Sequence, residues 1–269
     1  MKKTTTKPNR FLRLGLIITT LTVGFILLGT VWTPYPPNAI DTTARMLSPS
    51  LEHLMGTDKF GRDIFSRVMA GAGSTLFVAA GTVAIGTVIG TIVGALTGYF
   101  GGWIDETLMR INDALAAFPS ILLTLVLVSI LGAGRERLML ALGIVFIPSY
   151  ARIVRSEFAR ARSQNYVKSA QLMGASTFRI LFVHILPTVW QILVSAITIG
   201  FNNAVLAEAA MSYLSIGVSP DEASLGYMLS ESQSILDAAP WYAFGTGGVI
   251  VLLSLGVSLI GEGLQRSET

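Results

Sequence analysis

Six stretches of this sequence are dominated by apolar residues over the length that a membrane-crossing helix requires, and polar segments separate them. A helix that crosses the hydrocarbon core of a bilayer needs about 20 such residues. The stretches are Phe11–Trp32, Ser74–Phe100, Leu108–Leu131, Glu136–Val154, Thr188–Met211 and Trp241–Leu264. The pattern predicts an all-α membrane protein with six transmembrane helices.

The positions of Lys and Arg predict how these helices are oriented, because loops rich in basic residues stay in the cytosol. One basic group, at the first stretch, is Lys2, Lys3, Lys7, Arg10 and Arg13; another, after the fourth, is Arg152, Arg155, Arg160, Arg162, Lys168 and Arg179. An even number of crossings must separate the two groups, so the third and fourth stretches both cross and turn at Gly132–Arg137. The loop after the fifth stretch lacks Lys and Arg and is expected outside; its acidic residues are Asp221, Glu222, Glu231 and Asp237.

This orientation places both termini in the cytosol and divides the chain into four parts. Residues 1–32 hold the N-terminal tail and the first helix, and residues 33–73 form an extracytoplasmic segment with a surface helix. Residues 74–264 form a core of five helices that includes a polar cytosolic loop at 155–187, and residues 265–269 are a cytosolic tail.

Composition excludes an ordinary soluble domain. Of the 269 residues, 52% are hydrophobic and 13% are charged, against about 25% charged in globular proteins. The net charge is +3 and the chain has no cysteine, which excludes disulfides and thiolate metal sites. Because the basic residues gather on the predicted cytosolic face, the lipid bilayer is the expected partner and nucleic acid is not. The first apolar stretch exceeds the roughly 7–15 residues of a signal peptide, which predicts an uncleaved first helix.

A row of glycines follows one face of the second predicted helix. Gly86, Gly90, Gly94 and Gly98 are spaced by four residues, so they share a helical face on which a neighbouring backbone can approach closely. Packing within this chain and packing against another subunit both fit the pattern.

The polar segment Tyr166–Pro187 is typical of a surface that contacts a soluble partner. Ala170 and Gly174 share a helical face, with Met173 and Thr177 alongside. Small residues on an exposed face let a short helix enter a groove on a partner. We therefore expect a docking helix over Tyr166–Thr177. Gly174 permits a sharp turn, and Pro187 suits the first turn of the fifth transmembrane helix.

A second polar motif, Gly56–Arg67, precedes the second predicted helix. Asp58 and Asp63 suit turn and helix-capping positions. An apolar stripe follows, formed by Ile64, Phe65, Val68 and Met69. The stripe predicts a helix that lies along the outer membrane surface.

Three polar residues lie inside the fifth predicted helix: Asn202, Asn203 and Glu208. A carboxylate in a membrane is costly and should face a cavity or a partner. Glu208 fits either a polar pathway between the helices, near its outer end, or an interhelical hydrogen bond. The two histidines, His53 and His184, are isolated and predict no transition-metal site.

Two of these motifs resemble a known family. Tyr166–Pro187 resembles the signature loop of permease subunits of ATP-binding-cassette (ABC) importers, which reads Glu-Ala-Ala, three residues, Gly, and an Ile/Leu-Pro ending. The matching residues here are Ala170, Gly174, Ile185, Leu186 and Pro187. Lys168 stands where the family has Glu, and Ser169 stands where it has the first Ala. The chain therefore lacks the carboxylate for a salt bridge from that position to the ATPase. Gly56–Arg67 resembles the Gly-Thr-Asp-x-x-Gly-Arg-Asp element of the oligopeptide, dipeptide and nickel branch, and the resemblance runs from Trp32 to Arg266.

The resemblance implies a type I ABC importer permease fold with a cytosolic coupling helix, in a bacterial inner membrane. It implies contact with the ATPase through Tyr166, Lys168, Ala170, Met173, Gly174 and Thr177. The implied partners are a homologous second permease, two ATPase subunits that carry ATP and Mg, and an extracytoplasmic solute-binding protein. For the outer motif a structural role is favoured over contact with cargo or the binding protein; its residues are Gly56, Thr57, Asp58, Gly61, Arg62 and Asp63.

Three other classes of membrane protein fit the sequence less well than an importer permease: secondary transporters, intramembrane enzymes and scaffolds. No Gly-x-x-x-x-Gly-Lys-Ser/Thr motif occurs in the sequence, so the chain is expected to bind no cofactor and to be no enzyme itself. A secondary transporter would use charged or broken helices near the midplane, and Glu208 alone is thin support for one. An intramembrane enzyme or a scaffold fits less well still. For cargo, the run from Trp32 to Arg67 resembles the nickel permeases of this branch, and the resemblance favours nickel or a nickel chelate over peptides or glutathione.

Overall fold

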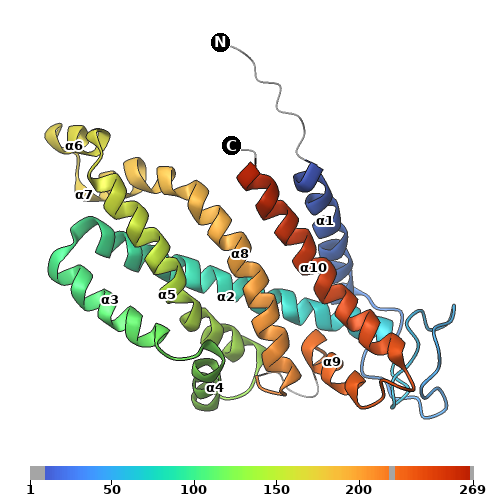
Figure 1. The fold of residues 1–269 in the computed structure, drawn as a ribbon. Helices are drawn as coiled ribbons and strands as arrows, with labels where there is room; N and C mark the ends of the chain where they lie inside the picture. The colour runs from blue at the N-terminus through green and yellow to red at the C-terminus, as the bar shows by residue number, and fades with distance from the viewer. Residues whose placement is uncertain (1–9, 218–221, 267–269) are drawn as a thin grey trace. The chain divides into compact units, whose positions relative to one another are not determined.

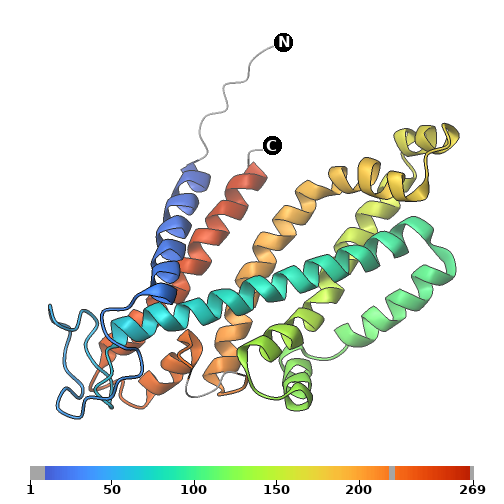
Figure 2. The same ribbon diagram turned by 180° about the vertical axis from the view of Figure 1, so that it is seen from behind.

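The computed structural model describes residues 10–217 and 222–266, and helices fill most of this part of the chain (Figures 1 and 2). The helices are α1 (Arg10–Val31), α2 (Ile64–Phe100), α3 (Gly102–Ala116), α4 (Ser120–Leu131), α5 (Arg135–Arg162), α6 (Asn165–Leu172), α7 (Thr177–Arg179), the π-helix η1 (Ile180–Ile185), α8 (Leu186–Tyr213), α9 (Leu225–Gln233) and α10 (Pro240–Arg266). The predictions about Lys2, Lys3, Lys7, Asp221 and the tail at 267–269 lie outside the described residues.

Five helical runs in the described part of the chain are long and apolar enough to cross a membrane: Arg10–Val31, Ile64–Phe100, Arg135–Arg162, Thr177–Tyr213 and Pro240–Leu264. A sixth crossing is reached if α3 and α4 count as one span. Their axes are bent by 93°, so the prediction of one continuous helix over Leu108–Leu131 is wrong. Pro119 explains the break, because proline lacks the backbone N–H and disfavours a helical conformation at the residue before it.

The second correction concerns the surface helix expected before residue 74. Asp63 caps a helix that continues to Phe100, since its Oδ2 accepts a hydrogen bond from the Ser66 backbone N–H at 2.8 Å. Of the apolar stripe, Ile64, Val68 and Met69 are buried in the protein and Phe65 is half-buried. The Phe65 ring centroid lies 5.5 Å from that of Phe25 in α1, and Gly29 of α1 lets Met69 approach. An apolar stripe looks the same in sequence whether it faces lipid or another helix.

By their contacts, the residues form two compact units. The first comprises Met1–Ala80, Val128–Leu138 and Phe201–Thr269. Within it, α1 and α10 run side by side in opposite directions (Figures 1 and 2). Glycines line this contact: a Cβ atom at Gly15 would lie 2.6 Å from the Ile260 nitrogen, and one at Gly263 would lie 2.7 Å from Leu12. The two backbones therefore approach closely without side chains between them.

The second unit comprises Gly81–Leu127 and Met139–Gly200, and in it the glycine row of α2 packs against α5. A Cβ atom at Gly94 would lie 2.6 Å from the carbonyl oxygen of Ala151, and one at Gly90 would lie 2.6 Å from Cβ of Tyr150. The sequence allowed packing within this chain or packing against another subunit, and the structure shows that the glycine row packs within this chain. On the same unit, Arg155 of α5 donates two hydrogen bonds to Asp105 of α3, at 2.6 and 2.7 Å.

Candidate functional site

The polar segment after α5 forms a short helix that ends in a glycine turn (Figure 1). Gly174 has φ 78°, its N–H donates to the Gln171 carbonyl, and the Ala175 N–H donates to the Ala170 carbonyl, both at 3.0 Å. These two bonds make a Schellman motif, the usual way to end a helix at glycine. The expected helix over Tyr166–Thr177 is therefore interrupted: α6 ends at Leu172, and Ser176 caps α7 by accepting from the Arg179 N–H.

The exposed face of this segment differs from the predicted one. Ala170 is buried, with 3% of its surface exposed, so it anchors α6 and does not face a partner. Met173, which was predicted, is 81% exposed, and two large apolar side chains that were not predicted are exposed near it, Leu172 at 89% and Phe178 at 70%. We call Leu172, Met173 and Phe178 the α6-end surface. Such exposure on a tightly turned segment is typical of an interaction site.

The remaining predicted docking residues lie on the solvent side of the same segment. Tyr166, Lys168, Gly174 and Thr177 are all exposed. A Cβ atom at Gly174 would meet no other atom within 4 Å, so the backbone conformation alone explains glycine there. The structure thus brings five of the six predicted residues to one exposed segment, and it buries Ala170.

The outer motif is one compact turn. Gly56 and Gly61 have φ 70° and 77°, a conformation that favours glycine. Asp58 accepts hydrogen bonds from the backbone N–H groups of Phe60 and Arg62, at 2.8 and 3.0 Å. The Thr57 hydroxyl accepts from the Leu47 N–H at 2.8 Å. The predicted structural role of the motif therefore agrees with its geometry.

His53 has a partner that its isolation in sequence concealed. Its Nδ1 lies 2.8 Å from Oδ1 of Asp63, whose other oxygen caps α2. Among the described residues, no group of three or more His, Asp or Glu side chains is arranged to hold a metal ion.

A buried group of charges joins this turn to α9 and α10. Arg62 donates to Asp58 at 2.6 Å and to Glu231 at 2.9 Å. Arg67, with 1% of its surface exposed, donates to Glu231 at 3.2 Å, and the Tyr242 hydroxyl donates to the same carboxylate at 3.0 Å. Burial alone would lower the pKa of Arg62, but the hydrogen bonds and negative charges of Glu231 and Asp58 outweigh it and raise that pKa. Arg62 therefore stays charged.

Sequence reasoning missed Arg67 and Glu231 as members of this group. Glu231 was noted only as an acidic residue of an outer loop. An arginine in the first turn of an apolar helix, four residues after the capping Asp63, was the one available signal, because such a charge needs a partner.

The polar residues of α8 are not brought together. Nδ2 of Asn202 donates to the Ser258 hydroxyl of α10 at 2.5 Å, whereas Asn203 is exposed. Glu208 is fully buried, and its Oε1 accepts from the Ser212 hydroxyl one helical turn later, at 2.7 Å. The hydroxyl of Thr75 in α2 lies close to the same carboxylate and interacts with it.

These features define a multi-pass helical membrane protein with an exposed apolar turn on a polar loop. Comparison with known proteins identifies it further. A family model described as "Binding-protein-dependent transport system inner membrane component" matches residues 86–267. The chain belongs to this family, whose members are the permease subunits of ABC importers.

Relatives match along nearly the whole chain. A dipeptide transport system permease protein DppC of Alkalihalophilus pseudofirmus is 37% identical over 259 residues, which cover 96% of this chain and 85% of that protein. DppC of Haemophilus influenzae is 36% identical, covering 96% and 90%. A putative peptide permease of Brucella suis is 37% identical, covering 96% and 87%.

The fold also matches a solved structure. An inward-facing form of the MetNI methionine ABC transporter superposes with a TM-score of 0.61 over 76% of this chain and 96% of that one, at 22% sequence identity. The chain therefore has the type I ABC importer permease fold, as its motifs implied. The prediction of an ABC importer permease in the inner membrane is confirmed, and the alternative of a secondary transporter is set aside.

Proposed function

We propose that this chain forms part of the path by which an ABC importer takes up dipeptides or short oligopeptides. The names of its relatives support peptides as cargo, because those that match 96% of the chain are called dipeptide or peptide permeases. Nickel, which the sequence between Trp32 and Arg67 favoured, becomes the competing cargo that the experiment must test.

The α6-end surface carries the proposal that the chain couples to an ATPase. A permease without its own ATP site must receive the energy of hydrolysis through a contact. The α6-end surface, on a basic, cytosolic loop, offers such a contact, because large apolar side chains that fill pockets on a partner supply much of the binding energy. Met173, Gly174 and Thr177 lie at this turn, and Tyr166 and Lys168 lie on α6 beside it. Lys168 in place of the family's Glu implies a different charge on the ATPase side.

The partners and sidedness follow from this role. We propose a second permease, two ATPase subunits that hold ATP and Mg, and an extracytoplasmic binding protein that delivers the peptide. Both termini lie in the cytosol, because Arg10 and Arg13 begin α1 and the basic loop after α5 must share their side. Residues 33–63 and α9 then lie outside, in agreement with the absence of Lys and Arg from α9.

Of the three polar residues expected along the path, Asn203 is the best placed to face it. It is the exposed member of the three, whereas Asn202 bonds to α10 and Glu208 is enclosed. We propose that Asn203 faces the path or the second permease, and that Asn202 and Glu208 set the geometry of α8.

The test is uptake of a radiolabelled dipeptide and of radiolabelled nickel, with and without chelator, in cells that lack the chain and in complemented cells. We expect dipeptide uptake to be lost on deletion and restored by complementation, while nickel uptake is unchanged. Loss of nickel uptake with normal dipeptide uptake would overturn the proposed cargo and leave the permease assignment intact.

A further inference from the structure

Two leucines stand exposed on a loop that the structure holds firmly. Leu51 is 98% exposed and Leu54 is 54% exposed. The loop between them is closed by hydrogen bonds from the Ser50 N–H to the His53 carbonyl at 2.8 Å and from the His53 N–H to the Ser50 hydroxyl at 3.0 Å. The Tyr35 hydroxyl also donates to the Glu52 carbonyl at 3.0 Å. A fixed loop that presents two leucines to water is unfavourable unless something apolar covers them.

The loop lies near the end of α1 and the start of α10, two of the helices long and apolar enough to cross a membrane. Trp32 directly follows α1, and its N–H continues the helical bonding to Leu28 at 2.8 Å. On the other side of the loop, a Cβ atom at Gly56 would lie 2.6 Å from Nε1 of Trp241, in the first turn of α10. Tryptophan is enriched at the level where a helix leaves the bilayer, so the exposed Trp32 marks that level. Trp241, whose Nε1 is buried, places the loop beside the start of α10.

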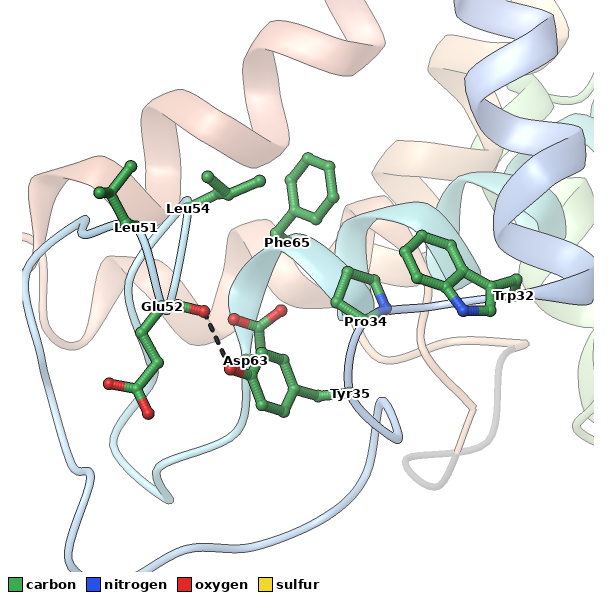
Figure 3. Close-up of a pocket in the computed structure, with 8 residues that line it drawn as sticks. All are labelled: Trp32, Pro34, Tyr35, Leu51, Glu52, Leu54, Asp63 and Phe65. Carbon is green, nitrogen blue, oxygen red and sulfur yellow. Dashed lines mark hydrogen bonds between the residues drawn. The ribbon is translucent and has the colours of Figure 1, made fainter.

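A shallow pocket connects Trp32 to the two leucines (Figure 3). Its volume is about 400 Å³; Trp32, Phe65, Leu51 and Leu54 form its apolar side, and Tyr35, Glu52 and Asp63 form its polar side. Figure 3 shows Leu51, Leu54 and Phe65 on one side of the loop and the Glu52 carboxylate on the other. The loop is thus amphipathic, with the charge turned away from the apolar side.

We infer that Leu51 and Leu54 insert into the lipid at the membrane surface where α1 ends, and that lipid fills the pocket beside Trp32. The exposed apolar surface of α1 leads directly to this site, since Leu27, Leu28 and Val31 precede Trp32 and are all exposed. The lipid-facing surface of α1 therefore ends at Trp32, and Leu51 and Leu54 continue this apolar surface beyond the helix. The inference holds on whichever side α1 ends and for any cargo.

The absence of cysteine from the chain permits a direct test. Single-cysteine variants Leu51→Cys, Leu54→Cys and Glu52→Cys of the full chain are spin-labelled and reconstituted in vesicles of phosphatidylcholine and phosphatidylglycerol. Collision of each label with oxygen, which concentrates in lipid, is compared with collision with a water-soluble paramagnetic chelate. Glu52→Cys is the matched control, because it lies on the same loop and points the other way.

We expect oxygen to dominate at positions 51 and 54 and the chelate to dominate at position 52. Similar chelate collision at all three positions would overturn the inference, because the leucines would then be in water. Protection of 51 and 54 from both reagents would also overturn it and would indicate that protein, such as a second copy, covers them. Transport is not the readout, so the result is independent of the proposed cargo and coupling.

Discussion

Arg62 and Glu231 are 169 residues apart in the sequence, yet Nη2 of Arg62 lies 2.9 Å from Oε1 of Glu231. The same carboxylate accepts hydrogen bonds from Arg67 and Tyr242. One side chain of α9 therefore holds the outer turn, the start of α2 and the start of α10 together. Because Arg67 is enclosed, this contact cannot be replaced by water without opening the structure.

Replacing Glu231 with Gln should destabilise the fold strongly. The change leaves Arg67 buried without its nearest counter-charge, and breaking a buried pair in this way typically costs about 3–5 kcal/mol. The measurement is thermal or denaturant unfolding of the purified protein in detergent. Glu106→Gln is the control, since Glu106 pairs with Arg110 at 2.8 Å on an exposed surface, where a pair contributes roughly 0–1 kcal/mol. Equal losses in the two variants would contradict the importance of the Glu231 contact.

Enlarging Gly94 should disturb the packing of α2 on α5. A Cβ atom there would meet the Ala151 carbonyl at 2.6 Å, so Gly94→Ala must push the helices apart, and overpacking of this kind costs about 1–3 kcal/mol. Gly248→Ala in α10 is the matched control, because no atom lies within 4 Å of its Cβ position and alanine favours helix by about 1 kcal/mol. Unfolding in detergent should show opposite signs for the two variants. A neutral Gly94→Ala would mean that the two helices are less closely packed.

Glu208 should act as a hydrogen-bond acceptor within α8. Glu208→Gln keeps an oxygen for the Ser212 hydroxyl and adds an N–H that can donate to Thr75, so folding and peptide uptake should be retained. Glu208→Ala removes the acceptor and leaves a buried hydroxyl unpaired, at a cost of about 1–3 kcal/mol. Unfolding in detergent and uptake in cells are measured for both variants. A folded Glu208→Gln protein without uptake would show instead that the path requires the carboxylate charge.

The apolar pattern predicted three of the six spans to within two residues at each end, the first, fifth and sixth, because an apolar stretch long enough to cross a bilayer is visible in the composition of the sequence. The first stretch, Phe11–Trp32, became Arg10–Val31, and the last, Trp241–Leu264, lies within Pro240–Arg266. The capping role of Asp63 was also predictable, since the interaction is local. Pro119 was visible in the sequence, but the 93° bend depends on how the two half-helices pack.

Contacts between distant residues were not predictable in the same way. The stripe after Asp63 fits lipid and protein equally, and only the position of α1 decides that Phe65 meets Phe25. Beside the glycine turn, the family pattern identified Met173, Gly174 and Thr177, which are exposed, but it did not identify the exposed Leu172 and Phe178. In a sequence, apolar residues beside a glycine turn are expected to be buried in the core. Only the path of the backbone shows that these side chains are exposed.

Met173→Asp should abolish peptide uptake while the protein still inserts into the membrane. Met173 is 81% exposed, so a charge there costs the fold little, but it would be buried without a partner in an ATPase groove. Uptake and the amount of protein in the membrane are measured together. Gln164→Asp is the control, because it adds the same charge at the other end of α6, where aspartate suits the N-cap position, and it should transport normally. Normal uptake by the Met173→Asp variant would contradict the proposed coupling role of the α6-end surface.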